Sequence, residues 1–204
     1  MSTRRIVLAT QNAHKVAELR AILADVASEL DLEVVGASDW ADAPDVVEDE
    51  VSFEGNARLK AQALAAHTGL PAVADDSGLA VEVLGGAPGI FSARWAGRHG
   101  DDRANLDLLL AQLADVKDEH RAAAFVCAAV LALPDGTFRS TEGHLSGSLA
   151  REPKGTNGFG YDPVLVVEGD GRHAAELSAE EKNAISHRGK AFRALVPHLR
   201  ELLG

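Results

Sequence analysis

Hydrophobic residues in the first seventy positions change their spacing in a regular order. Apolar residues cluster at residues 4–10 and then recur every three or four positions from Val16 to Leu30, a period typical of an amphipathic helix. A second helical pattern starts near Ser52 and stops at Gly69. The pattern therefore predicts a strand at 4–10, a helix at 16–30, a strand at 32–37 and a helix at 52–69.

Strand and hairpin patterns are more frequent in the rest of the chain. PAVAD at residues 71–75 predicts a strand that ends at the adjacent acids Asp75 and Asp76, after which the chain leaves through a glycine-rich stretch at 78–89. Ser178 and Glu181 form a capping-box pattern for the last helix. The other expected elements are a helix at 103–116, strands at 122–134 and 137–150 joined as a hairpin, a strand at 163–168, and a final helix that Pro197 bends or breaks.

Alternation of strands and helices in the first half, followed by hairpins, predicts an α/β protein with a mixed sheet rather than an all-parallel one. The sequence contains no internal repeat and no low-complexity linker. We therefore expect a single domain over residues 1–204.

Composition narrows the functional classes. Of the 204 residues 46% are hydrophobic, which is enough for a sizeable core, and the formal net charge is −11, which argues against general nucleic-acid binding. No signal peptide and no membrane-length apolar segment is recognised, so a soluble, cytoplasmic protein is expected. Cys127 is expected to be a buried structural thiol, and the histidines show no zinc-like spacing.

The stretch TQNAHK, residues 10–15, lies where the first strand meets the first helix. Free amides at a helix amino terminus attract anions, and Lys15 adds a full positive charge, so this turn could bind phosphates. The alternative is an ordinary helix cap provided by Thr10 or Asn12. The stretch lacks the glycine pattern of a P-loop.

Two groups of acids could bind a metal ion. Glu48 lies in the acidic loop 48–50, and Asp75 and Asp76 follow an apolar run, where a carboxylate must be paired, hydrogen-bonded or metal-bound. Oxygen ligands without imidazoles suit Mg²⁺. An acidic loop by itself is more often a solvated surface. Because neighbouring side chains of a strand point to opposite faces, we expect only one of the two aspartates to face the cleft.

Two further segments could bind a nucleotide base. GFGYD at 158–162 offers Phe159 and Tyr161 as stacking faces, although the same aromatics could instead fill a core. EEKNAISHRGK at 180–190 gathers several cations, among them Arg188, which can donate a forked pair of hydrogen bonds. A solvated basic helix start is the alternative.

Taken in order, six motifs resemble the Ham1/RdgB family of inosine and xanthosine triphosphate pyrophosphatases. They are ATQNAHK, SFEGNARLKA, ADDSGL, GGAPGIFSARWAG, PKGTNGFGYDP and EEKNAISHRGKA, and they extend over almost the entire chain. The resemblance implies a two-lobed α/β fold with a long mixed sheet and an active cleft between the lobes. It also implies a cytoplasmic homodimer that hydrolyses a purine nucleoside triphosphate with Mg²⁺, without nucleic-acid or membrane partners.

The resemblance also implies roles for individual residues. Asp76 is the expected catalytic residue, and Asp76 and Glu48 are the expected metal ligands. The expected substrate-binding residues are Thr10, Gln11, Asn12, Ala13, His14, Lys15, Ser77, Phe159, Gly160, Tyr161, Asp162, Lys182, His187 and Arg188. One departure is Gly55, which precedes Asn56 where the family often has glutamate, and the nearest acid is Glu54.

Two alternatives remain at this stage. A Maf-like pyrophosphatase of modified nucleotides would share a related fold, although its signature motifs differ from these. A non-hydrolytic nucleotide sensor would use the same turn and aromatic pocket, but it would have little need for Asp76 beside metal-binding acids.

Overall fold

The computed structural model of the chain describes residues 4–10 and 13–204, with the side chains of residues 13–15 and 18 left out. The chain forms two compact units. The first unit contains Met1–Asp76, Cys127–Gly143 and Arg188–Gly204, and the second contains Ser77–Val126 and His144–His187.

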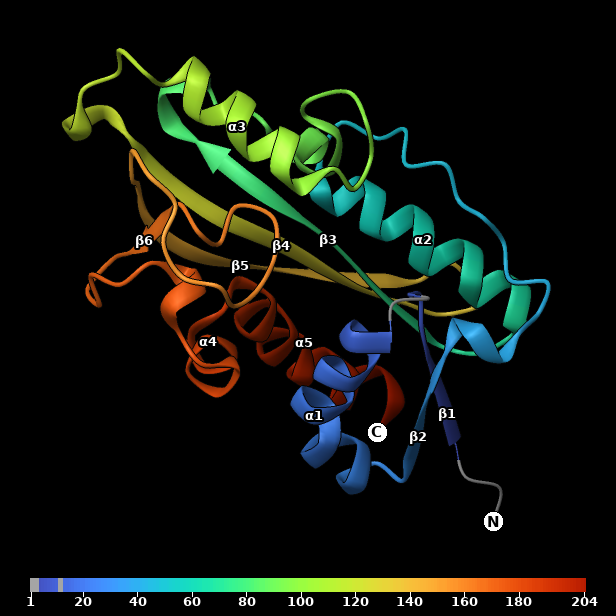
Figure 1. Ribbon diagram of the computed structural model, residues 1–204. Coiled ribbons are helices and arrows are strands. Elements are labelled where there is room, and N and C mark those ends of the chain that lie inside the picture. Colours follow the sequence, from blue (N-terminus) through green and yellow to red (C-terminus); the bar gives the residue numbers. More distant parts are fainter. Residues whose placement is uncertain (1–3, 11–12) are drawn as a thin grey trace. The chain divides into compact units, whose positions relative to one another are not determined.

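Six strands are hydrogen-bonded in the order β2-β1-β3-β4-β5-β6 (Figure 1). Strand β1 pairs in parallel with β2 and β3, whereas β5 and β6 are antiparallel, so the predicted mixed sheet is confirmed. The strands are β1 (Arg4–Leu8), β2 (Leu32–Gly36), β3 (Ala72–Val81), β4 (Ala122–Ala132), β5 (Phe138–Leu149) and β6 (Leu165–Val167).

The α-helices lie close to their expected positions. They are α1 (Ala13–Glu29), α2 (Phe53–Thr68), α3 (Asp102–Gln112), α4 (Ala179–Ile185) and α5 (His187–Leu203). Short 3₁₀ helices occur at Ala37–Asp39, Glu82–Leu84, Gly89–Arg94, Asp118–His120 and Ala174–Glu176. Among the described residues, no helix combines the length and the apolar character needed to cross a bilayer.

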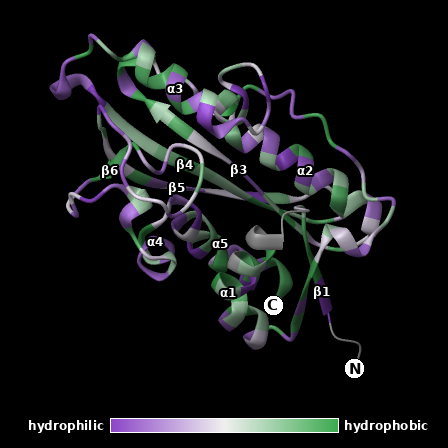
Figure 2. Cartoon of the chain, in the orientation of Figure 1, coloured by the Kyte–Doolittle hydropathy of each residue, from purple (hydrophilic) through white to green (hydrophobic). Residues whose placement is uncertain are grey.

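The first unit is a sheet covered by helices on both faces (Figure 1). Strand alternation divides its core, because Ile6 and Leu8 pack in one cluster with residues of α1 and α5, while Val7 packs with residues of α2 in another. Cys127 is fully buried in the first cluster, as expected for a structural thiol. Strand β4 appears largely hydrophobic in Figure 2, as expected for a strand covered on both faces.

The second unit has one continuous core. Leu106, Leu109 and Leu113 of α3 pack in a cluster with Leu79 of β3 and Phe125 of β4. The same cluster includes apolar residues of β5, β6 and the loops around them. Helix α3 therefore shares a core with residues of four strands, and the loop between β5 and β6 carries Phe159 to Asp162 of the candidate site.

Strand β3 differs from the expectation. It does not end at the two acids but continues through Asp75, Asp76 and Ser77 to Val81, so the prediction of a glycine-rich exit at this point was wrong. Charged side chains can occupy the middle of a strand when each has a polar partner. Both acids do have partners, which are described with the site.

The carboxyl-terminal helix also differs. Ser178 and Glu181 form both bonds of the predicted capping box at the start of α4. The helical path then stops at Ser186, whose backbone is extended (φ −60°, ψ 150°), whereas α5 runs through Pro197 without a break. The interruption lies eleven residues before the proline, and no proline or glycine in the sequence indicated it.

Arg121, directly before β4, is buried and bonds the ends of α3 and β5 in the second unit. It is only 2% exposed, and its guanidinium donates to the carbonyl oxygens of Leu149, Leu113 and Ala150 at 2.7, 2.7 and 3.0 Å. Burial lowers the pKa of Arg121 from its ordinary value, and the nearby Arg151 lowers it further. A single planar side chain thus connects the end of α3 to the end of β5.

Replacing Arg121 by alanine should lower the free energy of unfolding by about 3 kcal/mol or more, because three carbonyls lose a buried donor. Arg103→Ala is the matched control, since the exposed pair that Arg103 forms with Asp107 (2.7 Å) contributes about 0.5 kcal/mol at most. Urea denaturation of both variants measures the difference. Equal losses would contradict the role assigned to Arg121.

Candidate active site

The two acids of β3 point to opposite faces of the first unit's sheet. The Oδ2 atom of Asp76 accepts a hydrogen bond from Nδ2 of Asn56 on α2 at 3.1 Å. The Oδ2 atom of Asp75 accepts from Nε of Arg188 on α5 at 3.2 Å. Since α2 and α5 contribute to the clusters on opposite faces, the two side chains leave β3 on opposite faces, as strand geometry predicts.

Asn56 is a support for Asp76 that the sequence did not single out. It is 1% exposed, and its Oδ1 accepts the backbone N–H of Glu50 at 3.1 Å, so both ends of its amide are bonded. Ser52 fixes the start of α2 by accepting from the N–H of Gly55 at 3.0 Å. The amide group therefore holds one oxygen of Asp76 in a fixed direction.

Gly55 is explained by a close approach of the acidic loop. A Cβ atom at this position would lie 2.7 Å from Cβ of Glu50, which is too close for any larger residue without a shift of the loop. Glu54, the acid that precedes Gly55, accepts a hydrogen bond at 2.9 Å from the hydroxyl of Ser140 on β5. The family's usual glutamate at position 55 thus has no space here.

Asp75 and Arg188 form a buried ion pair. Their side chains are 3% and 6% exposed, and Sγ of Cys127 lies 4.0 Å from the same carboxylate oxygen. Breaking such a pair on one side leaves a buried charge with its desolvation cost uncompensated. Asp75 therefore holds Arg188, a predicted substrate-binding residue, in place from within the core.

Thr10 and Glu48 lie around one cavity of the first unit, with a volume of about 190 Å³. Lys60 of α2 also lines it, and its Nζ bonds Oε1 of Glu48 at 2.7 Å. Sequence reasoning missed Lys60, although its position four residues after Asn56 puts both on one face of α2. This cavity brings a predicted phosphate contact and a predicted metal ligand together with a lysine.

The rest of the predicted phosphate-binding turn is only partly described. Gln11 and Asn12 lie outside the described residues, as do the side chains of Ala13, His14 and Lys15. The junction itself has the expected form, with β1 ending at Leu8 and α1 beginning at Ala13.

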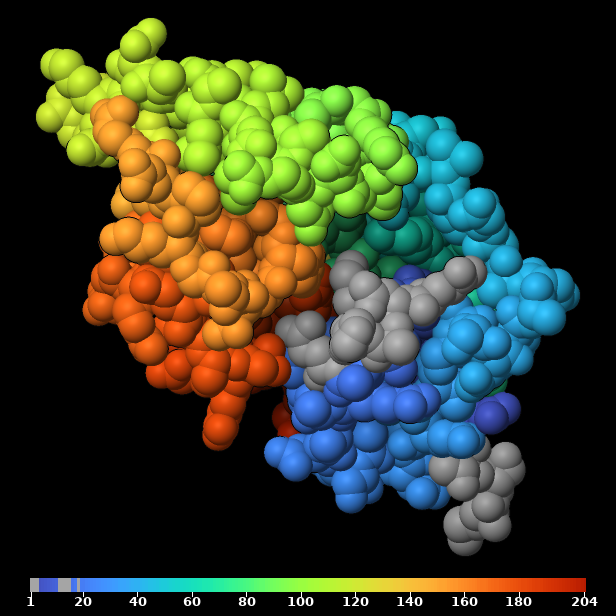
Figure 3. All heavy atoms as spheres, in the orientation of Figure 1, coloured from blue at the N-terminus to red at the C-terminus, as the bar shows by residue number. Residues whose placement is uncertain are grey.

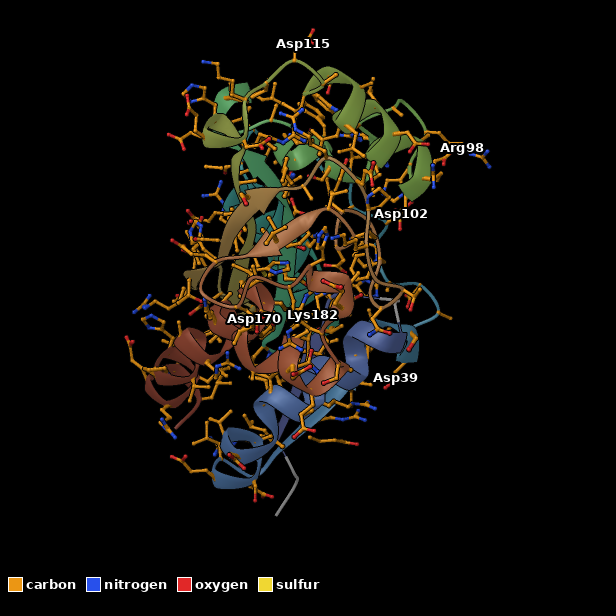
Figure 4. All side chains as sticks on the ribbon, turned by 60° about the vertical axis from the view of Figure 1, so that its left-hand side comes forward. Asp39, Arg98, Asp102, Asp115, Asp170 and Lys182 are labelled. Atoms are coloured by element: carbon orange, nitrogen blue, oxygen red, sulfur yellow. The ribbon has the colours of Figure 1, made fainter. Side chains whose placement is uncertain are left out.

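In the second unit a carboxylate organises the loop 158–162. Oδ2 of Asp162 accepts the backbone N–H of Phe159 at 2.8 Å and is bonded by Nζ of Lys182 at 2.5 Å. Nζ of Lys182 also lies 5.5 Å from the centre of the Phe159 ring, and Phe159 is 65% exposed. Figure 4 labels Lys182 on α4. An exposed aromatic face beside a fixed cation is therefore present.

Tyr161 fills the core, which was the alternative interpretation of the aromatics in GFGYD. Its ring is buried in the core of the second unit, and its hydroxyl donates to the carbonyl of Ser92 at 2.9 Å. Burial raises the pKa of Tyr161 above its ordinary value, and the charge of Asp102 raises it further. Its ring therefore anchors the loop while Phe159 remains exposed.

His187 and Ser77, the remaining predicted residues of this unit, differ in burial. His187 is buried, and its ring stacks on Phe125 with centroids 5.1 Å apart and an angle of 23° between the planes. Ser77 is half-buried on β3, directly after Asp76.

The donors present fit a hard cation. Among the described residues, no group of three or more His, Cys, Asp or Glu side chains is arranged to hold a metal. Mg²⁺ nevertheless needs only one or two carboxylates when phosphate oxygens and water complete its shell. Asp76, half-buried and held through one oxygen, and Glu48, beside the cavity, are oxygen donors of that kind.

The sequence as a whole matches the model of the Ham1 family over residues 6–198, and the chain belongs to that family. A dITP/XTP pyrophosphatase from Streptomyces avermitilis is 70% identical over 200 residues, which cover 98% of this chain and 99% of the relative. A protein of the same name from Corynebacterium efficiens is 52% identical over 206 residues, with 98% and 99% covered.

Solved structures share the fold. A HAM1 protein from Coxiella burnetii has 42% identity and a TM-score of 0.88, covering 97% of this chain and 99% of its own. The crystal structure of a nucleoside-triphosphatase / dITP/XTP pyrophosphatase from Mycobacterium abscessus has 52% identity and a TM-score of 0.81, covering 96% and 100%. The mixed α/β fold of this chain is therefore the fold of Ham1 proteins.

Substituting Gly55 by alanine tests the close approach that supports Asn56. Alanine in a helix normally stabilises by about 0.5–1 kcal/mol relative to glycine, but here we expect destabilisation of about 1–3 kcal/mol because the new Cβ meets Glu50. Thermal and urea unfolding measure the sign. Glu50→Gly removes the opposing Cβ, so Gly55→Ala should lose most of its cost in that background, and an unchanged cost would contradict the explanation.

Proposed function

We propose that this chain hydrolyses the non-canonical purine nucleoside triphosphates ITP, dITP and XTP to the monophosphate and pyrophosphate, thereby removing them from the nucleotide pool. The observation that carries the proposal is the setting of Asp76, a half-buried carboxylate whose direction is fixed by Asn56. The names of relatives that are 52–70% identical over nearly their whole length support it.

In the proposed reaction Asp76 accepts a proton from the water that attacks the α-phosphorus. The bond from this phosphorus to the bridging oxygen breaks, and pyrophosphate leaves with the bonding electron pair. Attack at the α-phosphorus rests on the family. Thr10, the turn that ends at Lys15 and the cavity-lining Lys60 bind the phosphates. Asp76 and Glu48 would hold Mg²⁺, which would supply positive charge to balance the phosphate oxygens.

The loop of the second unit is the proposed base-binding part. Phe159 stacks on the purine, and Nζ of Lys182 lies 5.5 Å from the centre of the phenylalanine ring. Inosine and xanthine carry an acceptor oxygen at position 6, where adenine carries an amino group. A donor such as Arg188 therefore favours the oxo purines.

A non-hydrolytic sensor is the second candidate from another class, since it would use the same loop. The support that Asn56 and Glu50 give to Asp76 favours hydrolysis over sensing, because a sensor gains nothing from an aligned carboxylate. No observation favours a Maf-like enzyme, and the family match is to Ham1.

Three further features of the proposal rest on the family and on composition. They are a homodimer, a cytoplasmic location, and a purine nucleoside triphosphate as partner without nucleic acid or membrane. The net charge of −11 supports the exclusion of nucleic acid. Sedimentation equilibrium at twice the mass of one chain would support the dimer, and the mass of a single chain would reject it.

Asp76→Asn should lower kcat by about 10³-fold while leaving the melting temperature near that of the wild type, because an asparagine oxygen still accepts from Asn56. Asp75→Asn should keep kcat within about tenfold yet lower the free energy of unfolding by about 3 kcal/mol, since Arg188 loses its charged partner. Steady-state kinetics and urea unfolding of the two variants give the comparison. Equal losses of kcat would contradict the division of the two acids.

With Mg²⁺, kcat/KM for ITP, dITP and XTP should exceed that for ATP by about 10⁴-fold, because a mismatched donor leaves buried polar groups unsatisfied. GTP shares the oxygen at position 6 and should be discriminated less strongly. Pyrophosphate release is the measurement, and EDTA should abolish it. Binding of ITP without release would favour the sensor, and release of inorganic phosphate would exclude the proposed reaction.

A further inference from the structure

The exposed ring of Phe159 lies on a loop whose backbone is held from two sides. Phe159 and Gly160 are consecutive, and the N–H of each donates to a different carboxylate. Asp162 takes the first at 2.8 Å from within the loop, and Asp102 takes the second at 3.0 Å from α3. Asp102 is 58 residues away in sequence and was not among the predicted site residues.

Asp102 is well suited to hold this amide. It is the first residue of α3, where the partial positive charge of a helix amino terminus favours an ionised carboxylate. Asp101 caps the same helix by accepting from the N–H of Ala104 at 3.2 Å, so the cap does not depend on Asp102. Figure 4 labels Asp102 at this end of α3. The carboxylate is thus available for the loop without a cost to the helix.

The loop 158–162 turns tightly around Phe159. Gly158 and Gly160 both have positive φ, 75° and 60°, so the chain turns tightly on either side of Phe159. A Cβ at Gly158 would lie 2.0 Å from Oδ2 of Asp162, which leaves no space for a stiffer residue there. In Figure 3 the orange segment that contains this loop lies directly beside the yellow-green surface of α3. The bond to Asp102 spans these two segments.

The contacts inside the loop leave Phe159 largely exposed. Tyr161 is anchored in the core through Ser92, and Asp162 is bonded to Lys182. Phe159 is 65% exposed, and its ring centre lies 5.5 Å from Nζ of Lys182. The backbone fixes the direction of the Cα–Cβ bond from which an exposed ring extends. With the Phe159 amide fixed by Asp162 and the Gly160 amide fixed by Asp102, the peptide plane between them cannot rotate freely.

We propose that Asp102 is a positioning residue that presents the Phe159 ring for stacking on a purine base. The hydrogen bond to Gly160 orders the loop before the ligand arrives, which lowers the entropy lost on binding. The identity of the ligand as a purine rests on the proposed function. The hydrogen bond between Asp102 and Gly160 and its effect on the loop do not depend on it. Asp102 contacts neither substrate nor reacting atoms.

Two variants of Asp102 separate the hydrogen bond from the fold. Asp102→Ala removes the acceptor, and Asp102→Asn keeps an oxygen in the same place. Asp107→Ala is the matched control, because Asp107 is an exposed aspartate of the same helix paired with Arg103. The measurements on each protein are the exchange rate of the Gly160 amide by NMR, the Kd for IMP by calorimetry, and KM and kcat for ITP.

In Asp102→Ala the Gly160 amide should exchange about tenfold faster. The Kd for IMP and the KM for ITP should rise together by about three- to tenfold, with kcat within about twofold, because stacking acts equally in the ground and transition states. Asp102→Asn should restore all of these values to within about twofold of the wild type, and Asp107→Ala should change none. A purely structural role would instead change the melting temperature and leave the Kd for IMP unaltered.

Three results would overturn the inference. They are an unchanged exchange rate in Asp102→Ala, faster exchange with an unchanged Kd for IMP, and an equal effect of Asp107→Ala. Because IMP binding requires no turnover, a wild-type chain that binds IMP without hydrolysing ITP would refute the proposed function alone. The role of Asp102 would then still be decided by its effect on the Kd.

Discussion

Two consecutive carboxylates in the middle of one strand require two different partners, because their side chains leave the strand on opposite faces. The first unit provides these partners from its two helical layers, Asn56 of α2 for Asp76 and Arg188 of α5 for Asp75. Without such partners, burying either charge would cost several kcal/mol. The positions of α2 and α5 around β3 therefore determine which acid is held in the core and which remains partly accessible.

The two partners differ in kind, and this difference separates the tasks of the acids. A neutral amide fixes the direction of Asp76. A guanidinium neutralises Asp75 and is itself held by it. The loop of the second unit follows the same physical rule with backbone donors, since the Phe159 and Gly160 amides each bond one carboxylate. In both units a carboxylate fixes the direction of a group that carries the proposed recognition or chemistry.

Much of the fold could be predicted from spacing alone. The bounds of α2 followed from Ser52 and Gly69, which form the two caps through a side-chain bond and a left-handed backbone. The continuation of β3 past its acids could not be predicted, because it depends on Asn56 and Arg188, which are distant in sequence. The stop at Ser186 likewise has no local signal, whereas Pro197 has one and is tolerated within α5.

The candidate site was predictable where a motif carries its own chemistry. The opposite directions of Asp75 and Asp76 followed from strand geometry, and the aromatic motif correctly identified a loop with an exposed ring. Which of its two aromatics enters the core depended on the Ser92 carbonyl that bonds Tyr161. The supporting residues Asn56, Lys60 and Asp102 were missed because each acts through a contact that only the folded chain creates.

The central claim is that water attacks the α-phosphorus of an oxo-purine triphosphate and releases pyrophosphate. The most direct measurement is the hydrolysis of ITP with Mg²⁺ in ¹⁸O-enriched water, followed by mass spectrometry of the products. The account predicts one ¹⁸O atom in the nucleoside monophosphate and none in pyrophosphate. Label in pyrophosphate or in inorganic phosphate, or the absence of any product, would contradict it.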